Sequence, residues 1–178
     1  MKIYIQMTGL DPLKDHIIQI CCYVTDSNMT FLSPTPFEAT VHAPDDILDS
    51  MDEWCTRVHA GTGLTAKSRE SKLSIEAAAD QLLQYIRYLV PTRKMGLLAG
   101  NSVHFDKAFL AKWCPKVIDH LNYRIVDVST VGEAARMWCS QEVRGNIPVK
   151  EMKHEAKSDI LESIEEMKYY KEKIFDGK

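Results

Sequence analysis

The feature that most constrains the fold of this chain is a nearly continuous apolar run from Ile17 to Val24. Such a run predicts a central strand that is buried on both faces. Short segments at 2–6 and 37–42 are also rich in strand-forming residues, and each ends at a turn that contains glycine or proline. Three successive strands with short connections predict an antiparallel meander.

The hydrophobic period changes in the middle of the chain. From Ser74 to Pro91, apolar residues recur at intervals of three and four, which predicts an amphipathic helix over 74–90 with Ser74 as its N-cap. Strand-like segments then alternate with helix-like ones; the strands are expected at 97–100 and 124–128, and the helices at 106–113, 131–139 and 157–174. This order predicts an α/β fold, in which a mixed sheet (an antiparallel meander, then parallel strands) is flanked by helices. With 178 residues and no low-complexity linker, we expect a single domain, 1–178.

Composition limits the partners that the chain can bind. The net charge is −3, so any phosphate contacts must come from a local pocket. This argues against extended, sequence-independent binding along a duplex and permits the binding of a small oligonucleotide. Five scattered cysteines without metal-ligand spacing predict reduced thiols in an intracellular protein, in the cytoplasm or the mitochondrion. No segment reaches the roughly 18 apolar residues that span a bilayer, and the chain starts directly with strand-like residues, so we expect no membrane partner and no leader peptide.

Polar residues gather at three expected strand ends or helix starts, where α/β proteins usually place their sites. The segments are 6–11 (Gln-Met-Thr-Gly-Leu-Asp), 100–106 (Gly-Asn-Ser-Val-His-Phe-Asp) and 154–159 (His-Glu-Ala-Lys-Ser-Asp). Two further segments, 51–54 (Met-Asp-Glu-Trp) and 123–129 (Tyr-Arg-Ile-Val-Asp-Val-Ser), combine aromatic and charged residues. Each segment alone is weak evidence, because a single Asp at a helix start is more often a cap than a ligand.

In this order and spacing, the segments resemble the oligoribonuclease family of DEDDh 3′–5′ exoribonucleases. That family carries Asp-x-Glu-Met-Thr-Gly-Leu-Asp on its first strand, then Met-Asp-x-Trp, Gly-Asn-Ser-x-x-x-Asp, Tyr-Arg-x-x-Asp-Val-Ser and His-x-Ala-x-x-Asp. The resemblance runs from residue 2 to about residue 172. It implies the ribonuclease-H-like exonuclease fold and an activity on short RNA.

The resemblance also implies a two-metal site. Two Mg²⁺ or Mn²⁺ ions about 3.5–4 Å apart would be held by four carboxylates, and a histidine would act as general base toward the attacking water. The matching positions are His154 for the base and Asp106 and Asp159 for two of the acids. The other two acids fall on Tyr4 and Gln6, which are neutral, so we expect a weak or lost metal site, no tightly bound metal, and hydrolysis that is lost or strongly impaired.

The substrate-holding positions keep the residue types of the family. By resemblance, Leu10 and Trp54 pack on the bases of a dinucleotide, and a phosphate cap is formed by His59, Ser102 and Arg124, with Tyr123 contributed across a homodimer interface. An arginine–phosphate contact is charge-assisted, and an aromatic platform suits single-stranded bases. We therefore expect a homodimer that binds a dinucleotide or short oligoribonucleotide.

Other readings of these residues stay open. Leu10 and Trp54 are alternatively core residues, and Asp106 and Asp159 are alternatively helix caps. In function, one alternative is a residual metal-dependent 3′–5′ exoribonuclease acting on di- and oligoribonucleotides, with Asp11 helping to rebuild a weaker site. Another is a pocket recruited to a different small ligand, with His154, Tyr4 and the two aspartates as a metal-free acid/base cluster.

Overall fold

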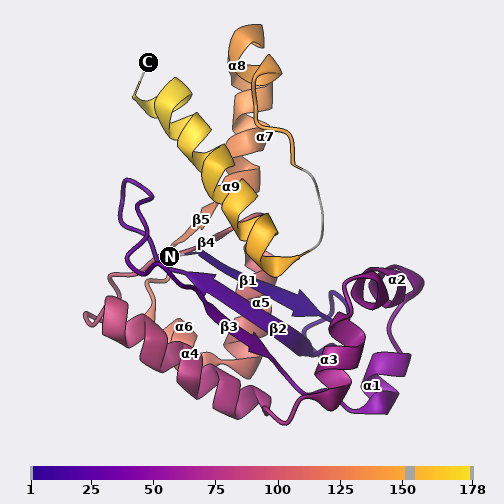
Figure 1. Ribbon diagram of the computed structural model, residues 1–178. Coiled ribbons are helices and arrows are strands. Elements are labelled where there is room, and N and C mark those ends of the chain that lie inside the picture. Colours follow the sequence, from indigo (N-terminus) through magenta and orange to yellow (C-terminus); the bar gives the residue numbers. More distant parts are fainter. Residues whose placement is uncertain (1, 151–154, 177–178) are drawn as a thin grey trace.

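The sheet has five strands in the spatial order β3-β2-β1-β4-β5. The structure is a computed structural model, and it describes residues 2–150 and 155–176. β1 (Lys2–Met7), β2 (Ile17–Tyr23) and β3 (Phe37–Thr40) pair antiparallel, whereas β4 (Leu98–Gly100) is parallel to β1 and β5 (Ile125–Asp127) is parallel to β4. The predicted meander followed by parallel strands is confirmed (Figure 1).

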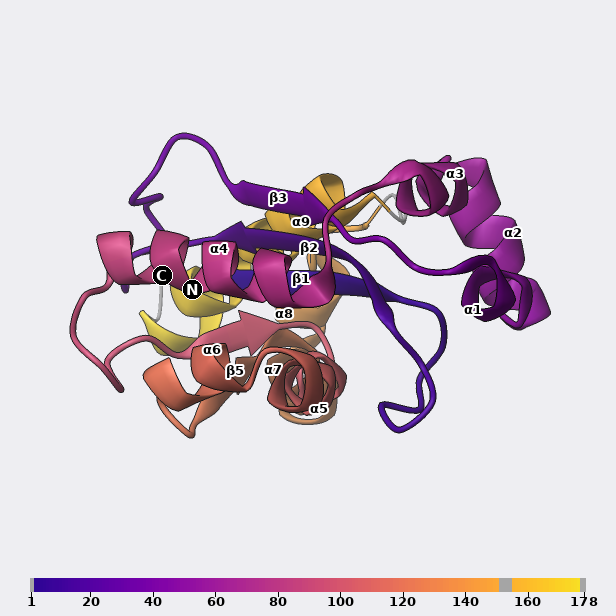
Figure 2. The ribbon, with the colours of Figure 1, turned by 90° about the horizontal axis from the view of Figure 1, so that it is seen from below.

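Alternation along β1 sends its side chains to two different layers. Ile3 and Ile5 face the main core, which contains buried residues of α4 (Ile75–Leu89) and α5 (His104–Trp113). Tyr4 faces the other side, where it packs against residues of α9 (Ala156–Tyr170). Figure 1 shows α9 lying across one face of the meander, and Figure 2 shows α4 beside α5 and α6 (Pro115–His120). β2 is buried on both faces, as its sequence predicts.

The helix predicted over 74–90 is present as α4. Its N-cap is Ser74, whose side chain accepts a hydrogen bond from the Ala77 N–H, and the helix ends at Leu89, just before Pro91. Its buried positions are spaced by three and four (Ala78, Leu82, Leu83, Ile86). A cap and one continuous apolar stripe are local signals, which is why this element could be read from the sequence.

Several short helices were not predicted. They are α1 (Asp45–Asp49), α2 (Glu53–Gly61), α3 (Leu64–Glu70), α6 (Pro115–His120) and α8 (Gln141–Gly145). Helices of one to three turns have few core-facing residues, so their periodicity is weak and tertiary packing decides whether they form. Pro115 illustrates this, because it begins α6 at the first helical position as well as following the end of α5.

α7 (Val128–Trp138) and α9 pack against each other beyond the parallel strands (Figure 1). Gly132 permits this contact, because a Cβ there would lie 2.9 Å from the Tyr170 hydroxyl. α7 begins three residues earlier than predicted, since the Asp127 side chain caps it by accepting from the Ser129 N–H. The helix predicted over 157–174 is present as α9 followed by a π-helical turn, Lys171–Phe175.

Candidate functional site

A cavity of about 460 Å³ lies at the C-terminal end of β1, between α2 and the start of α5. Six residues that the sequence proposes for the site line this cavity: Tyr4, Gln6, Leu10, Trp54, Ser102 and Asp106. They come from β1, the turn after it, α2 and the β4–α5 connection, so the fold brings together segments about a hundred residues apart. Asn101 and Phe105 also line it, and sequence reasoning did not single them out, although both lie within the 100–106 segment.

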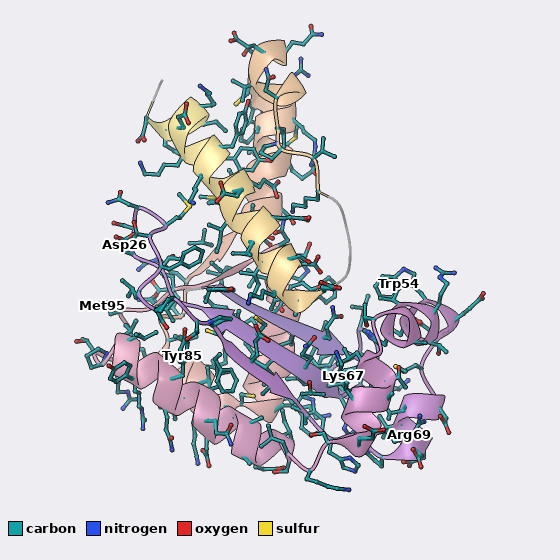
Figure 3. The ribbon with its side chains drawn as sticks, viewed as in Figure 1. Asp26, Trp54, Lys67, Arg69, Tyr85 and Met95 are labelled. Atoms are coloured by element: carbon teal, nitrogen blue, oxygen red, sulfur yellow. The ribbon has the colours of Figure 1, made fainter. Side chains whose placement is uncertain are left out.

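The apolar wall of the cavity is formed by side chains that are exposed rather than packed in the core. Leu10 is 63% exposed and Trp54 is 49% exposed, so the reading of these two residues as core is wrong. Trp54 stands in the first turn of α2 (Figure 3), where Asp52 caps the helix by accepting from the Cys55 N–H at 2.7 Å. A large apolar surface open to a cavity is the kind that can stack on a base.

The turn after β1 positions Leu10. The Thr8 hydroxyl donates to Asp15 Oδ1 at 3.1 Å, and the Asp11 N–H donates to Asp15 Oδ2 at 2.8 Å. A Cβ at Gly9 would lie 2.4 Å from Asp15 Oδ2, so a larger residue there would displace the carboxylate that holds this turn. Asp11 belongs to this turn and is absent from the cavity lining, so it does not join Asp106 there.

Tyr4 lies at the centre of the polar part of the site. Its hydroxyl accepts a hydrogen bond from Gln6 Nε2 at 3.3 Å and donates one to the carboxylate of Asp159. Burial raises the pKa of Tyr4 far above its ordinary value, and the negative charges of Asp159 and Asp106 raise it further. The phenol therefore stays protonated at neutral pH.

Asp106 is held by the sheet. Its Oδ1 accepts a hydrogen bond from the Ile5 N–H at 3.1 Å, and the residue is only 7% exposed. In the parallel pairing of β1 with β4, Lys2 lies opposite Ala99. Further along β1, the Asp106 carboxylate accepts the backbone hydrogen bond that a neighbouring strand would otherwise accept.

Neither aspartate is a helix cap, contrary to that reading of the sequence. The N-caps of α5 and α9 are Val103 and Glu155, and neither makes a side-chain cap bond. Asp106 and Asp159 instead lie in the first turns of these helices, with their side chains bound to β1.

Ser102 is held in a strained conformation at the edge of the cavity. Its φ is 48°, in the left-handed region that non-glycine residues rarely adopt. The Asp127 carboxylate compensates by accepting from the N–H groups of both Ser102 and Ser129, each at 3.0 Å. Asp127 therefore has a structural role, because it fixes the backbone that carries the Ser102 side chain at the cavity.

Three residues proposed for the phosphate cap, His59, Tyr123 and Arg124, do not line the cavity. His59 is 1% exposed, and its Nε2 donates to the Met7 carbonyl oxygen at 2.9 Å. Tyr123 is 70% exposed next to β5, with the Arg124 guanidinium carbon 4.7 Å from its ring centroid. His154, proposed as the general base, lies outside the described residues.

The acidic groups do not form a recognisable metal site. Within 2–150 and 155–176, no three His, Cys, Asp or Glu side chains lie together as a metal ion requires. Asp106 is bound to a backbone N–H and Asp159 to a phenol, and the first-strand positions supply an amide and a phenol in place of carboxylates. This donor set does not fit a pair of divalent ions, which would need more negative charge to offset their repulsion.

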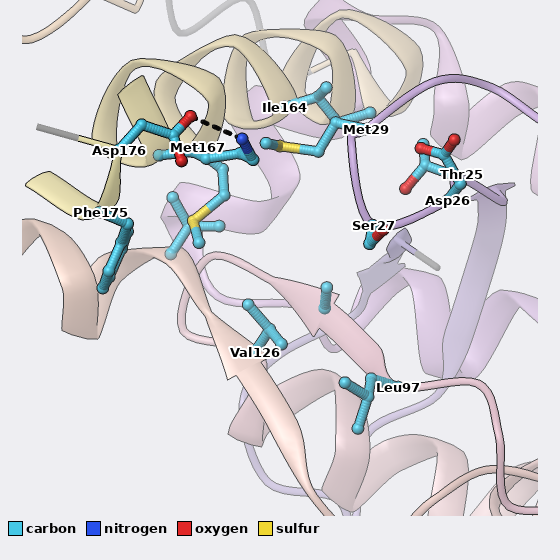
Figure 4. A pocket seen from close by; sticks show the side chains of 13 residues that line it. Thr25, Asp26, Ser27, Met29, Leu97, Val126, Ile164, Met167, Phe175 and Asp176 are labelled. Atoms are coloured by element: carbon cyan, nitrogen blue, oxygen red, sulfur yellow. Dashed lines mark hydrogen bonds and ion pairs between the residues drawn. The ribbon is translucent and has the colours of Figure 1, made fainter. Parts of the chain in front are cut away.

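A separate apolar cavity of about 330 Å³ lies between the loop after β2, the parallel strands and the C-terminal helix (Figure 4). Met29, Val126, Ile164 and Met167 form much of its wall, and a Lys171–Asp176 ion pair of 2.7 Å lies at its edge. It shares no residue with the cavity beside β1, so it is not part of the proposed nucleotide site.

The described part of the chain has free cysteines and no membrane helix. Cys21, Cys22, Cys55 and Cys114 are buried, and Cys139 is half-buried. Burial raises the pKa of Cys21 to about 12, so its thiol is unreactive at neutral pH. Within that part, no helix combines the length and the apolar character needed to cross a bilayer.

Known proteins share both the sequence and the fold. The chain matches the exonuclease family over residues 6–167. It is 42% identical to the mitochondrial oligoribonuclease of Saccharomyces cerevisiae (93% of this chain and 63% of that protein) and 43% identical to the human mitochondrial oligoribonuclease (98% and 72%). It is also 43% identical to the oligoribonuclease of Chromobacterium violaceum, over 94% of this chain and 90% of that protein. The chain thus spans less than two thirds of the yeast protein's length.

The fold also matches a more distant solved structure, that of E. coli exonuclease I in complex with a dT13 oligonucleotide. The TM-score is 0.72 at 17% identity, and the match covers 99% of this chain and 42% of the exonuclease. At that identity the likeness supports the fold alone, and it agrees with the ribonuclease-H-like architecture expected from the sequence. The family match and the three relatives together show that this chain belongs to the oligoribonuclease family of exonucleases.

Proposed function

We propose that this chain binds short oligoribonucleotides in the cavity beside β1 and has lost the two-metal hydrolysis of its family. The observation that carries the proposal is the hydrogen-bonded chain from Gln6 through Tyr4 to Asp159. A phenol donates to the carboxylate to which a metal ion would otherwise bind, and it occupies a position where the family has an acid. Exonucleases of this family typically use divalent metal ions, and this donor set does not suit them.

The binding half of the proposal rests on the apolar wall. Leu10 and Trp54 remain open to the cavity, and Ser102 lies at its edge with its backbone fixed by Asp127. A volume of about 460 Å³ falls within the usual range for small-molecule sites. The ligand class is therefore a 5′-phosphorylated dinucleotide or a slightly longer oligoribonucleotide.

The hydrogen bonding argues against metal-free acid/base catalysis as the main function. Because the pKa of Tyr4 is raised, the phenol does not ionise near neutral pH and cannot act as a base. Its proton is already donated to Asp159, so it is not directed at a ligand. These two facts favour a structural role for Tyr4 over a proton-transfer role.

We also propose that residues 1–178 form one intracellular domain, in the cytoplasm or mitochondrion, that acts as a homodimer. One continuous sheet with helices on both faces supports a single domain. The exposed Tyr123 ring, stacked with Arg124, is free of the cavity of its own chain and available to a second copy. Analytical ultracentrifugation of wild type and Tyr123→Ala tests this, and a monomeric wild type contradicts it.

The test of the main proposal compares wild type with the double variant Tyr4→Asp/Gln6→Glu. Hydrolysis of a labelled 5′-phosphorylated diribonucleotide is measured with Mg²⁺ and with Mn²⁺, and binding of the same dinucleotide is measured in EDTA. We expect wild type to bind the dinucleotide without hydrolysing it, and the double variant to bind Mn²⁺ and to hydrolyse it.

The matched control is Tyr4→Phe, which removes the phenol hydroxyl without adding a carboxylate. It should stay inactive, because an empty position is not a metal ligand. A wild type that hydrolyses at nearly the rate of the double variant contradicts the loss of catalysis and establishes a metal-dependent exoribonuclease. A wild type that fails to bind the dinucleotide at millimolar concentration contradicts the binding role.

A further inference from the structure

The turn that carries Leu10 lies outside the hydrophobic core. None of the residues from 9 to 16 is buried, and Leu10 and Leu13 are 63% and 83% exposed. Figure 2 shows this turn, in indigo, projecting from the sheet on the side of α5. Core packing therefore does not set the position of Leu10, and contacts of the turn with neighbouring elements have to do so.

Hydrogen bonds inside the turn make it one unit. The Asp15 N–H donates to the Asp11 carbonyl oxygen at 2.7 Å, and the Asp15 carboxylate accepts from the Thr8 hydroxyl and from the Asp11 N–H. The His16 N–H donates to the Thr8 hydroxyl oxygen at 3.0 Å. These bonds hold the shape of the turn, but because they stay inside it they do not place it relative to Trp54 on α2.

Side chains from the last turn of α5 attach this unit to the rest of the fold. The Trp113 indole N–H donates to the Asp15 carbonyl oxygen at 3.3 Å, and Lys112 Nζ donates to the Leu13 carbonyl oxygen at 3.1 Å. The His16 ring lies against the Trp113 ring, with their centroids 4.7 Å apart. α5 therefore holds the turn at two backbone positions and at one side chain.

Trp113 is itself fixed by the core. Its ring is partly buried and packs against the main hydrophobic core. Lys112 is exposed, and its ammonium lies 4.2 Å from the centroid of the Trp113 ring, a cation–π geometry that keeps the long side chain near the turn. The first turn of the same helix carries Asp106, which accepts from the Ile5 N–H of β1. One helix thus holds both β1 and the turn that follows it.

From these contacts we infer that Trp113 and Lys112 are positioning residues of the ligand site, which hold the turn where Leu10 lines the cavity together with Trp54. Neither Trp113 nor Lys112 lines the cavity, so both act through Leu10. The inference rests on the proposed function, because the ligand is taken to be the dinucleotide bound beside β1. It deepens that function by naming the residues that preorganise the apolar wall.

The first measurement needs no ligand. Amide hydrogen exchange is compared between wild type and Trp113→Phe, which keeps an aromatic ring at the core and removes the indole donor. We expect the Asp11 and Asp15 amides to exchange faster in the variant, because a turn released from α5 opens more often, while α4 exchanges as in wild type. Lys112→Met leaves the core untouched, because Lys112 is exposed, and should have the same effect to a smaller degree. Unchanged exchange at the turn in both variants overturns the inference.

The second measurement is a double-mutant cycle on dinucleotide binding. A 5′-phosphorylated diribonucleotide is titrated by calorimetry, in EDTA, into wild type, Lys112→Met/Trp113→Phe, Leu10→Ala and the variant with all three substitutions. Loss of the two bonds from α5 should weaken binding about tenfold, since the apparent affinity falls with the fraction of molecules whose turn is in the binding position. In the Leu10→Ala background the same two substitutions should change the affinity by less than about twofold, because the side chain through which they act is gone.

The matched control is Lys116→Met, which removes an exposed lysine of α6 that bonds to Asp80, and it should leave the affinity unchanged. Equal losses with Leu10 and with Ala at position 10 would mean that Trp113 and Lys112 stabilise the fold without positioning Leu10. That result overturns the inference and leaves dinucleotide binding intact. If wild type fails to bind the dinucleotide, both this inference and the proposed function are wrong.

Discussion

The Tyr4 hydroxyl should stabilise the fold in the absence of any metal, and Tyr4→Phe isolates its contribution. The substitution keeps the ring that packs against the apolar cluster of β2 and α9, and it removes the bonds to Asp159 and Gln6. A hydrogen bond to a charged group is worth about 1.5–3 kcal/mol. Because Asp159 is half-buried and water can partly replace the phenol, we expect the lower end, a loss of about 1.5 kcal/mol.

For a domain of this size, each kcal/mol lowers Tm by about 2–4 °C, so Tyr4→Phe should melt about 3–6 °C below wild type. Urea unfolding followed by circular dichroism gives the free energy, and calorimetry gives Tm. The matched control is Tyr88→Phe, since Tyr88 is 85% exposed on α4 and its hydroxyl should contribute less than about 0.5 kcal/mol. EDTA should change neither value.

The result that would refute this reasoning is a Tyr4→Phe protein whose unfolding free energy equals that of wild type while EDTA lowers the stability of both. That outcome would mean that a bound metal, and not the phenol, holds Asp159 and Asp106 beside β1.

Two further predictions concern binding and pH. Trp54→Ala should weaken dinucleotide binding about tenfold to a hundredfold, because one base stack is lost. The control Trp138→Ala removes a 79% exposed tryptophan outside the cavity and should leave binding unchanged. Equal effects of the two substitutions in a fluorescence titration would contradict the stacking role. Because burial raises the pKa of Tyr4 above its ordinary 10.0, the unfolded chain loses this proton first as pH rises, so the stability due to Tyr4 is complete below pH 10 and declines above it. The advantage of wild type over Tyr4→Phe in urea unfolding should therefore shrink by about 1 kcal/mol between pH 10 and 11, and a constant difference would show that the phenol is not desolvated.

The sequence by itself determined the architecture, because its strongest signals are local. Examples are the apolar run of β2, the Ser74 cap and the apolar stripe along α4. Each of these signals depends on residues that are only a few positions apart in the sequence. The order of such segments, together with motifs in register with a known family, was enough for the sheet class and for six of the cavity-lining residues.

Only the tertiary structure decided what the polar residues do. Asp106 bonds to Ile5, 101 positions away, and is not a cap. Tyr4 meets Asp159 from the far end of the sequence, and His59 bonds to the Met7 carbonyl oxygen without lining the cavity. The short helices α1–α3, of which α2 carries Trp54, were likewise missed. Periodicity reports which face of an element is buried, whereas the partner of a buried polar atom depends on which distant segment packs against it, and that is set by the whole fold.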